Sequence, residues 1–214
     1  MTDSLLIPII MTIVGAATPI LLAALGELVV EKSGVLNLGV EGMMLIGAVT
    51  GFAVTATTGY APLGVVAAMI ASAASAGLFG FLTLTLTANQ VATGLALTIF
   101  GIGLSALAGE NYVGQTVDVF GSVFPASLAE HPVLRVIFGY SPLVYVSLLL
   151  VAAVSWFLRK SRAGLILRAV GESDLSAHSI GYPVIGVRYM AVLFGGAMAG
   201  IAGCFYSLVL TPMW

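Results

Sequence analysis

The chain has 214 residues, of which 60% are hydrophobic and only 7% are charged, and its mean hydropathy is +1.14. About a quarter of the residues of a soluble domain are charged, so this composition excludes a soluble globular protein and makes lipid the expected solvent. The formal net charge is −2, and no basic stripe interleaved with aromatic residues occurs, which argues against nucleic-acid binding.

Six apolar segments are each near the roughly 20 residues that a membrane-crossing helix needs. Backbone groups in lipid must bond within their own segment, which favours helices, and the alternating pattern of a β-barrel is absent. We therefore predict an all-α fold, a polytopic membrane helix bundle that forms a single domain over residues 1–214. In chain order the segments are Leu5–Leu25, Val35–Thr58, Pro62–Ala88, Gln90–Gly109, Ser141–Leu158 and Tyr189–Leu210.

Basic residues orient this bundle, because Lys and Arg gather on the cytoplasmic side of membrane proteins. Five of the seven lie in the loop 159–188, Lys32 falls on the same face, and Arg135 falls on the other. The face with six basic residues is therefore predicted to be cytoplasmic. The first helix then starts outside, unless Val35–Thr58 is broken or re-entrant.

The loop of residues 110–140 is predicted to lie on the extracytoplasmic side. It is too apolar for a free tail, and an interfacial helix is expected near Ser127–Phe138. Such a helix could dock an extracellular partner or cap the helix ends, and the sequence favours neither interpretation.

Small residues recur at four-residue spacing within three of the segments, which places them on one face of a helix. The pairs are Gly47 with Gly51, Ala73 with Gly77, and Gly196 with Gly200. This spacing allows helices to approach closely in a membrane, so we interpret these glycines as helix-packing positions.

Glu41 is the one ionisable residue that these boundaries place well inside a segment, about 10 Å past Gly34 in a regular helix. Asn37, one turn earlier, would share its face. A charge at the bilayer centre costs about 2.5–3.5 kcal/mol on insertion scales, so Glu41 must face protein or water or be protonated. Asn37 and Glu41 could line a translocation path. Alternatively, Glu41 makes an inter-helix hydrogen bond or pairs with Lys32.

Signatures of catalysis and of metal binding are missing. The chain has no H-E-x-x-H, no G-x-S-x-G, no paired cysteines and no P-loop. His131 and His178 lie in opposite loops, which argues against a shared metal site. We therefore expect a non-enzyme with no catalytic residue, no metal and no cofactor of its own.

The cytoplasmic loop 159–188 carries the clearest local pattern. Gly171 can break an incoming helix, Ser173 is a good N-cap, and Gly181 followed by Pro183 can end the next helix. This pattern predicts a two-turn helix, Asp174 to Ile180, across the cytoplasmic face. A short helix between loops suits insertion into a groove of a partner, or it has only a topological role.

Two passages resemble the membrane-spanning permease subunits of ATP-binding-cassette importers, in the family that serves ribose-type sugars, branched-chain amino acids and nucleosides. Residues 34–48, GVLNLGVEGMMLIGA, look like the second-helix signature of the nucleoside (basic membrane protein) branch, and residues 168–181 resemble the cytoplasmic loop that touches the ATPase subunit. Family members continue for two or three further membrane segments beyond this point. The chain is therefore expected to be incomplete at its C-terminus.

The resemblance implies a multi-pass subunit of the cell (inner) membrane that translocates a nucleoside or a simple sugar. Its implied partners are a second permease subunit, ATPase subunits that bind ATP, and an extracytoplasmic solute-binding protein. Coupling to the ATPase is expected at Gly171, Glu172, Ser173, Asp174, Ala177 and Gly181. The alternatives are an ion-coupled secondary carrier, with Glu41 as its ion site, and a membrane scaffold subunit that transports nothing.

Overall fold

A computed structural model describes residues 3–117 and 138–214 of the chain, and every regular element in these ranges is helical. The α-helices are α1 (Asp3–Lys32), α2 (Val40–Thr58), α3 (Ala61–Gly80), α4 (Gln90–Gly109), α7 (Pro142–Lys160), α8 (Arg162–Glu172), α9 (Asp174–Ser179) and α10 (Val184–Phe205). Short π-helical turns extend α3 (η1, Phe81–Thr85) and α10 (η3, Tyr206–Leu210), and a 3-10 turn extends α4 (η2, Glu110–Tyr112). The predicted all-α class is confirmed.

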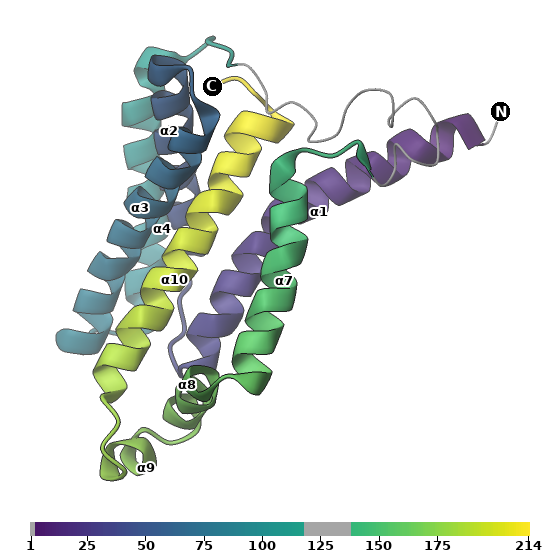
Figure 1. Cartoon of the computed structure of the whole chain (residues 1–214). Helices are drawn as coiled ribbons and strands as arrows, with labels where there is room; N and C mark the ends of the chain where they lie inside the picture. The colour runs from purple at the N-terminus through teal and green to yellow at the C-terminus, as the bar shows by residue number, and fades with distance from the viewer. Residues whose placement is uncertain (1–2, 118–137) are drawn as a thin grey trace.

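Six helices in the described ranges are long and apolar enough to cross a membrane, which confirms the six predicted segments. They are Leu6–Lys32, Val40–Thr58, Ala61–Thr85, Gln90–Tyr112, Pro142–Lys160 and Val184–Leu210. Figure 1 shows them as a bundle with α10 at its middle, and with α8 and α9 at the end opposite to both termini.

The first helix is longer than predicted. It does not end at Leu25 but continues through Leu28, Val29 and Val30 to Lys32. Its 30 residues span about 45 Å, more than the roughly 30 Å of the hydrocarbon core. The helix leans away from the bundle toward its N-terminal end in Figure 1, as an over-long membrane helix is expected to do.

The second helix is shorter than predicted, because α2 begins at Val40 rather than at Val35. Residues 33–39, here called the extended segment, connect it to α1. Gly34 adopts φ +82°, which right-handed helix does not allow, and the Asn37 side chain accepts a hydrogen bond from the backbone N–H of Gly39 at 2.9 Å. These two features break the helix that the apolar pattern alone suggested.

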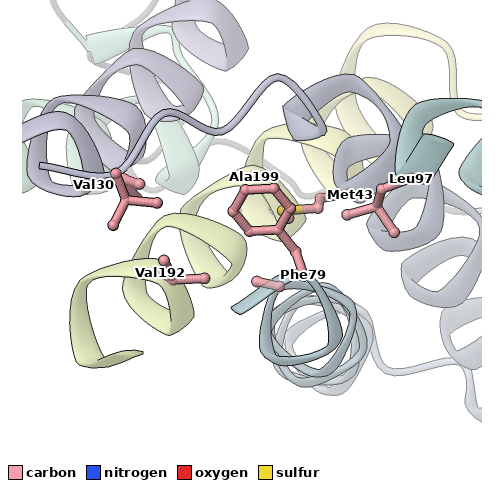
Figure 2. Close-up of a cluster of buried hydrophobic side chains, with 8 residues drawn as sticks. Val30, Met43, Phe79, Leu97, Val192 and Ala199 are labelled. Atoms are coloured by element: carbon pink, nitrogen blue, oxygen red, sulfur yellow. The ribbon is translucent and has the colours of Figure 1, made fainter. Parts of the chain in front are cut away.

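One core cluster gathers side chains from α10 and from the four helices α1 to α4. Figure 2 shows this cluster, with Val30 of α1, Met43 of α2, Phe79 of α3, Leu97 of α4 and Val192 of α10. All five are buried. This cluster joins the start of α2 to the helices on either side of it.

Glycines bring α2, α3 and α10 into close contact. A Cβ atom on Gly47 would lie 2.6 Å from the Cα atom of Gly200, and one on Gly51 would lie 2.5 Å from the Cys204 sulfur. A Cβ atom on Gly196 would collide with that of Ala76. All three positions therefore require a residue without a side chain. The interfacial helix predicted near Ser127–Phe138 lies outside the described residues except for Phe138.

Candidate functional site

Helices α8 and α9, with Ile180 after them, form a bend, here called the elbow (residues 162–180). Ser173 separates them, and its side chain accepts a hydrogen bond from the backbone N–H of Ser176 at 3.3 Å, as an N-cap does. Gly181, at φ +94°, follows α9, and the Tyr182 N–H donates back to the Ala177 carbonyl at 3.1 Å. The helix predicted at Asp174 to Ile180 is thus present as α9.

Gly171 has a different role from the predicted one. It does not end the incoming helix, because α8 continues to Glu172. Instead its Cα lies against the end of α1, where a Cβ atom would collide with the Lys32 carbonyl oxygen and reach 3.1 Å from the Gly34 nitrogen. Gly171 is therefore the point at which the elbow touches the α1 end and the extended segment.

The outer face of the elbow combines apolar and acidic side chains. Leu175 is 79% exposed and Ile180 is 75% exposed, while Glu172 and Asp174 are exposed close by. Ala177 points the other way and is 2% exposed. Two large apolar side chains thus protrude from an otherwise polar loop. Leu175 and Ile180 were not among the predicted site residues, although their apolar character within a polar stretch was the available signal.

Arg188, at the start of α10, links the elbow to the extended segment. Its Nη2 lies 3.7 Å from the Asp174 carboxylate, and its Nε donates a hydrogen bond to the Ser33 carbonyl at 3.2 Å. The Arg188 side chain is only 22% exposed, so its two partners hold it in place. From the sequence, Arg188 was interpreted only as one of the basic residues that orient the bundle.

The extended segment lies at membrane depth beside α4. The Leu38 carbonyl accepts from the Thr98 hydroxyl at 3.2 Å, and a Cβ atom on Gly39 would reach 3.2 Å from the Gly94 carbonyl. Thr98 is eight residues into α4, about 12 Å from the first residue of that helix. Non-helical backbone is tolerated at such depth only where protein groups satisfy it.

Side chains from two other helices supply those partners. The Leu36 N–H donates to Gln90 Oε1 at 2.8 Å, and the Asn37 N–H donates to Glu27 Oε1 at 3.2 Å. Gln90 is the first residue of α4, as the predicted segment Gln90–Gly109 has it. The extended segment is therefore held by α1, α4 and α10 together, and it is placed to transmit motion between them and α2.

Glu27 is a carboxylate within the α1 span that the sequence analysis did not identify. One oxygen receives the Asn37 N–H, and the other, Oε2, is buried without a hydrogen-bond partner in the described structure. Glu27 was missed because the first segment was ended at Leu25. The apolar residues Leu28, Val29 and Val30 were the signal that the helix continues past it.

Asn37 and Glu41 do not share a helix face, contrary to the prediction, because Asn37 precedes α2. Asn37 is 2% exposed, and its side chain bonds the Gly39 N–H, so it shapes the extended segment. Glu41 is exposed and lines a hollow of about 360 Å³ whose wall is otherwise mainly apolar. That hollow lies between α2 and α10, with Met44, Leu45, Ala48, Gly203 and Tyr206 around it.

The sequence of the chain is similar to those of known transport proteins. Residues 9–213 match the family model described as the permease component of branched-chain amino acid transport systems. The chain is 43% identical over 206 residues to the “Putative glucose ABC transporter permease protein TsgC13” of Haloferax volcanii, covering 94% of this chain and 63% of that protein. No solved structure matches the chain.

Two further relatives carry nucleoside names. The guanosine ABC transporter permease protein NupQ of Bacillus subtilis is 33% identical, over 89% of this chain and 64% of that protein. The nucleoside ABC transporter permease protein NupC of Lactococcus lactis is 27% identical, over 91% of this chain and 65% of that protein. The chain thus spans a little under two thirds of the length of these relatives.

Proposed function

Because this chain belongs to the family of permease components of branched-chain amino acid transport systems, we propose that it is the membrane-spanning subunit of an ATP-binding-cassette importer. It is a multi-pass protein of the cell membrane with six apolar spans. The proposed activity is movement of a small polar solute inward, driven by ATP that partner subunits bind and hydrolyse.

The observation that carries this proposal is the chain of contacts from the elbow to the extended segment. Asp174 on α9 meets Arg188, Arg188 bonds the Ser33 carbonyl, and Gly171 lies against Lys32 and Gly34. A push on the outer face of α9 therefore reaches the backbone that leads into α2. Alternating access needs such rigid connections, because packed interfaces switch between discrete arrangements.

The proposed coupling surface is the exposed side of the elbow. Leu175 and Ile180 would enter an apolar groove of an ATPase subunit, and Glu172 and Asp174 would pair with basic residues at its rim. Ser173 and Gly181 set the ends of α9, and Ala177 and Gly171 seat the elbow on the bundle. ATP-driven closure of two ATPase subunits would then move two such elbows together, one from each subunit of a permease pair.

The proposed solute is a nucleoside or a simple sugar, delivered by an extracytoplasmic binding protein. Relatives named for glucose, guanosine and nucleosides support a ligand rich in hydroxyl groups. In the hollow between α2 and α10, Glu41 is an exposed hydrogen-bond acceptor on an apolar wall. It would orient hydroxyl groups, while Asn37 acts indirectly by shaping the start of α2.

The test reverses the charge of the elbow. The double variant Glu172→Lys/Asp174→Lys should reduce co-purification of the ATPase subunit by about tenfold, because like charges would then face each other across the contact. The bundle should stay folded, since Asp174 is 56% exposed and its pair with Arg188 contributes little to stability. The control is Glu110→Lys, which reverses the charge of an exposed side chain directly after α4, at the end of the bundle away from the elbow.

Unchanged co-purification of the ATPase subunit with the elbow variant would overturn the assignment of the coupling surface. Uptake of radiolabelled nucleoside in energised cells separates the proposal from an ion-coupled carrier. Depleting ATP while the ion gradient is maintained should stop uptake, and uptake that persists would favour the carrier, with Glu27 and Glu41 as its membrane carboxylates.

A further inference from the structure

A groove runs along the cytoplasmic ends of α1 and α7 and has no role in the coupling described above. Its volume is about 330 Å³. Leu25 and Leu28 of α1 form one apolar wall, and Val151 and Leu158 of α7 form the other. Both helices run toward the cytoplasm here, so the apolar part of the groove lies within the membrane and extends over about 10 Å of helix length.

Cations close the cytoplasmic end of this groove. Lys32 ends α1, Arg159 lies in the last turn of α7, and Arg168 reaches the groove from α8. All three side chains are exposed. Three separate helices thus bring positive charge to one place, next to the ends of the apolar spans Leu6–Lys32 and Pro142–Lys160.

Two carboxylates, Glu31 and Glu172, line an adjoining hollow together with Lys32 and Arg168, but neither lines the groove. Within residues 3–117 and 138–214, the salt bridge found is the one between Arg188 and Asp174. The three cations of the groove are therefore available to an external anion.

We propose that this groove binds an anionic phospholipid of the cytoplasmic leaflet. The headgroup phosphate would lie among Lys32, Arg159 and Arg168, and one acyl chain would pack between Leu28 and Val151. Basic pockets between membrane helices on the cytoplasmic side select anionic headgroups in this way. The apolar walls favour a lipid over a soluble phosphate, which would leave them exposed to water.

The test is lipid retention by the purified chain. The protein is extracted in mild detergent and titrated with phosphatidylglycerol or phosphatidylcholine, and bound lipid is counted by native mass spectrometry. Phosphatidylglycerol should bind about tenfold more tightly than phosphatidylcholine, and Arg159→Gln/Arg168→Gln should remove most of that preference.

Two controls make the result specific. Lys160→Gln/Arg162→Gln removes the same charge from neighbouring exposed positions that do not line the groove, and it should leave the preference intact. Ser155→Phe fills the apolar part without changing a charge, because Ser155 lines the groove. This variant should weaken binding of both lipids.

A competition experiment separates a lipid from a soluble anion. Inorganic phosphate should displace phosphatidylglycerol only at far higher concentrations than a second anionic lipid does.

Several outcomes would overturn the proposal. Equal retention of the two lipids would mean that the groove has no headgroup selectivity. Equal losses in the Arg159/Arg168 and Lys160/Arg162 variants would reduce the effect to general surface charge. Competition by inorganic phosphate at the same concentration as by lipid would assign the cations to a soluble anion, and a dimer that excludes lipid would assign the groove to a second copy of the chain.

Discussion

Two carboxylates in the membrane-spanning part of the chain have opposite surroundings. Glu27 is half-buried and holds the backbone of Asn37, whereas Glu41 is exposed beside a hollow. A buried acceptor that satisfies a backbone N–H is a structural group, because its loss leaves a donor unpaired. An exposed carboxylate on an apolar wall satisfies no backbone donor, so it can accept hydrogen bonds from a solute.

Substitutions at the two sites should therefore have different effects. Glu27→Ala should lower the unfolding free energy by about 1–3 kcal/mol, because the Asn37 N–H loses its partner. Glu41→Ala should leave folding almost unchanged but reduce solute uptake severalfold. The stability of each variant is measured in detergent, by size-exclusion chromatography after heating. Its solute uptake is measured in cells and normalised to expression.

Glu27→Gln is the matched control, because the amide keeps an acceptor oxygen at the same position and should preserve most of the stability. If Glu41→Ala abolishes expression, Glu41 is a structural residue and the proposed solute contact is wrong. If Glu27→Ala is as stable as the parent, the hydrogen bond to Asn37 does not hold the extended segment.

At the level of helices, hydropathy and length were enough to find all six spans, because lipid demands about 20 apolar residues in each. The same criterion failed at residues 33–39. Val35, Leu36 and Leu38 keep the local hydropathy high, so the break is invisible to it. The break depends on tertiary partners, Gln90 and Glu27, which hydropathy does not reveal.

The elbow was easier to predict than the extended segment. Capping by Ser173 and the turn at Gly181 are local features, so α9 could be placed from neighbouring residues alone. The role of Gly171 could not, because it depends on Lys32 and Gly34, which are more than 130 residues away in the chain. Local signals were thus readable in the sequence, and contacts between distant segments were not.

The contact between α2 and α10 gives a prediction at this level. Gly47→Val should destabilise the bundle by about 1–3 kcal/mol, because the new side chain would collide with Gly200 and with the Ser72 hydroxyl. That is expected to lower the apparent melting temperature by about 5 °C. Gly103→Val is the control, since a Cβ atom there meets nothing within 4 Å, and it should melt within about 1 °C of the parent. Equal melting of the two variants would contradict close packing at Gly47.

Across the whole molecule, the two ends of the bundle carry different features. The elbow, Lys32 and Arg188 gather at one end, and Val113, in the turn after α4, lies at the other with the C-terminus (Figure 1). Lys and Arg mark the cytoplasmic side, so we predict that the elbow end faces the cytoplasm. The proposed ATPase contact and the proposed lipid site both require this orientation.

Cysteine labelling tests the orientation directly. The native Cys204 is fully buried and should stay silent toward a membrane-impermeant maleimide. His178→Cys, on the exposed side of α9, should be labelled in inverted vesicles and not in intact cells, and Val113→Cys, 72% exposed in the parent, should show the reverse. Labelling of His178→Cys from outside would place the elbow on the wrong side for any nucleotide-driven partner. Because one rigid bundle carries both positions, a single reversed result would remove the physical basis for the coupling surface and for the lipid groove together.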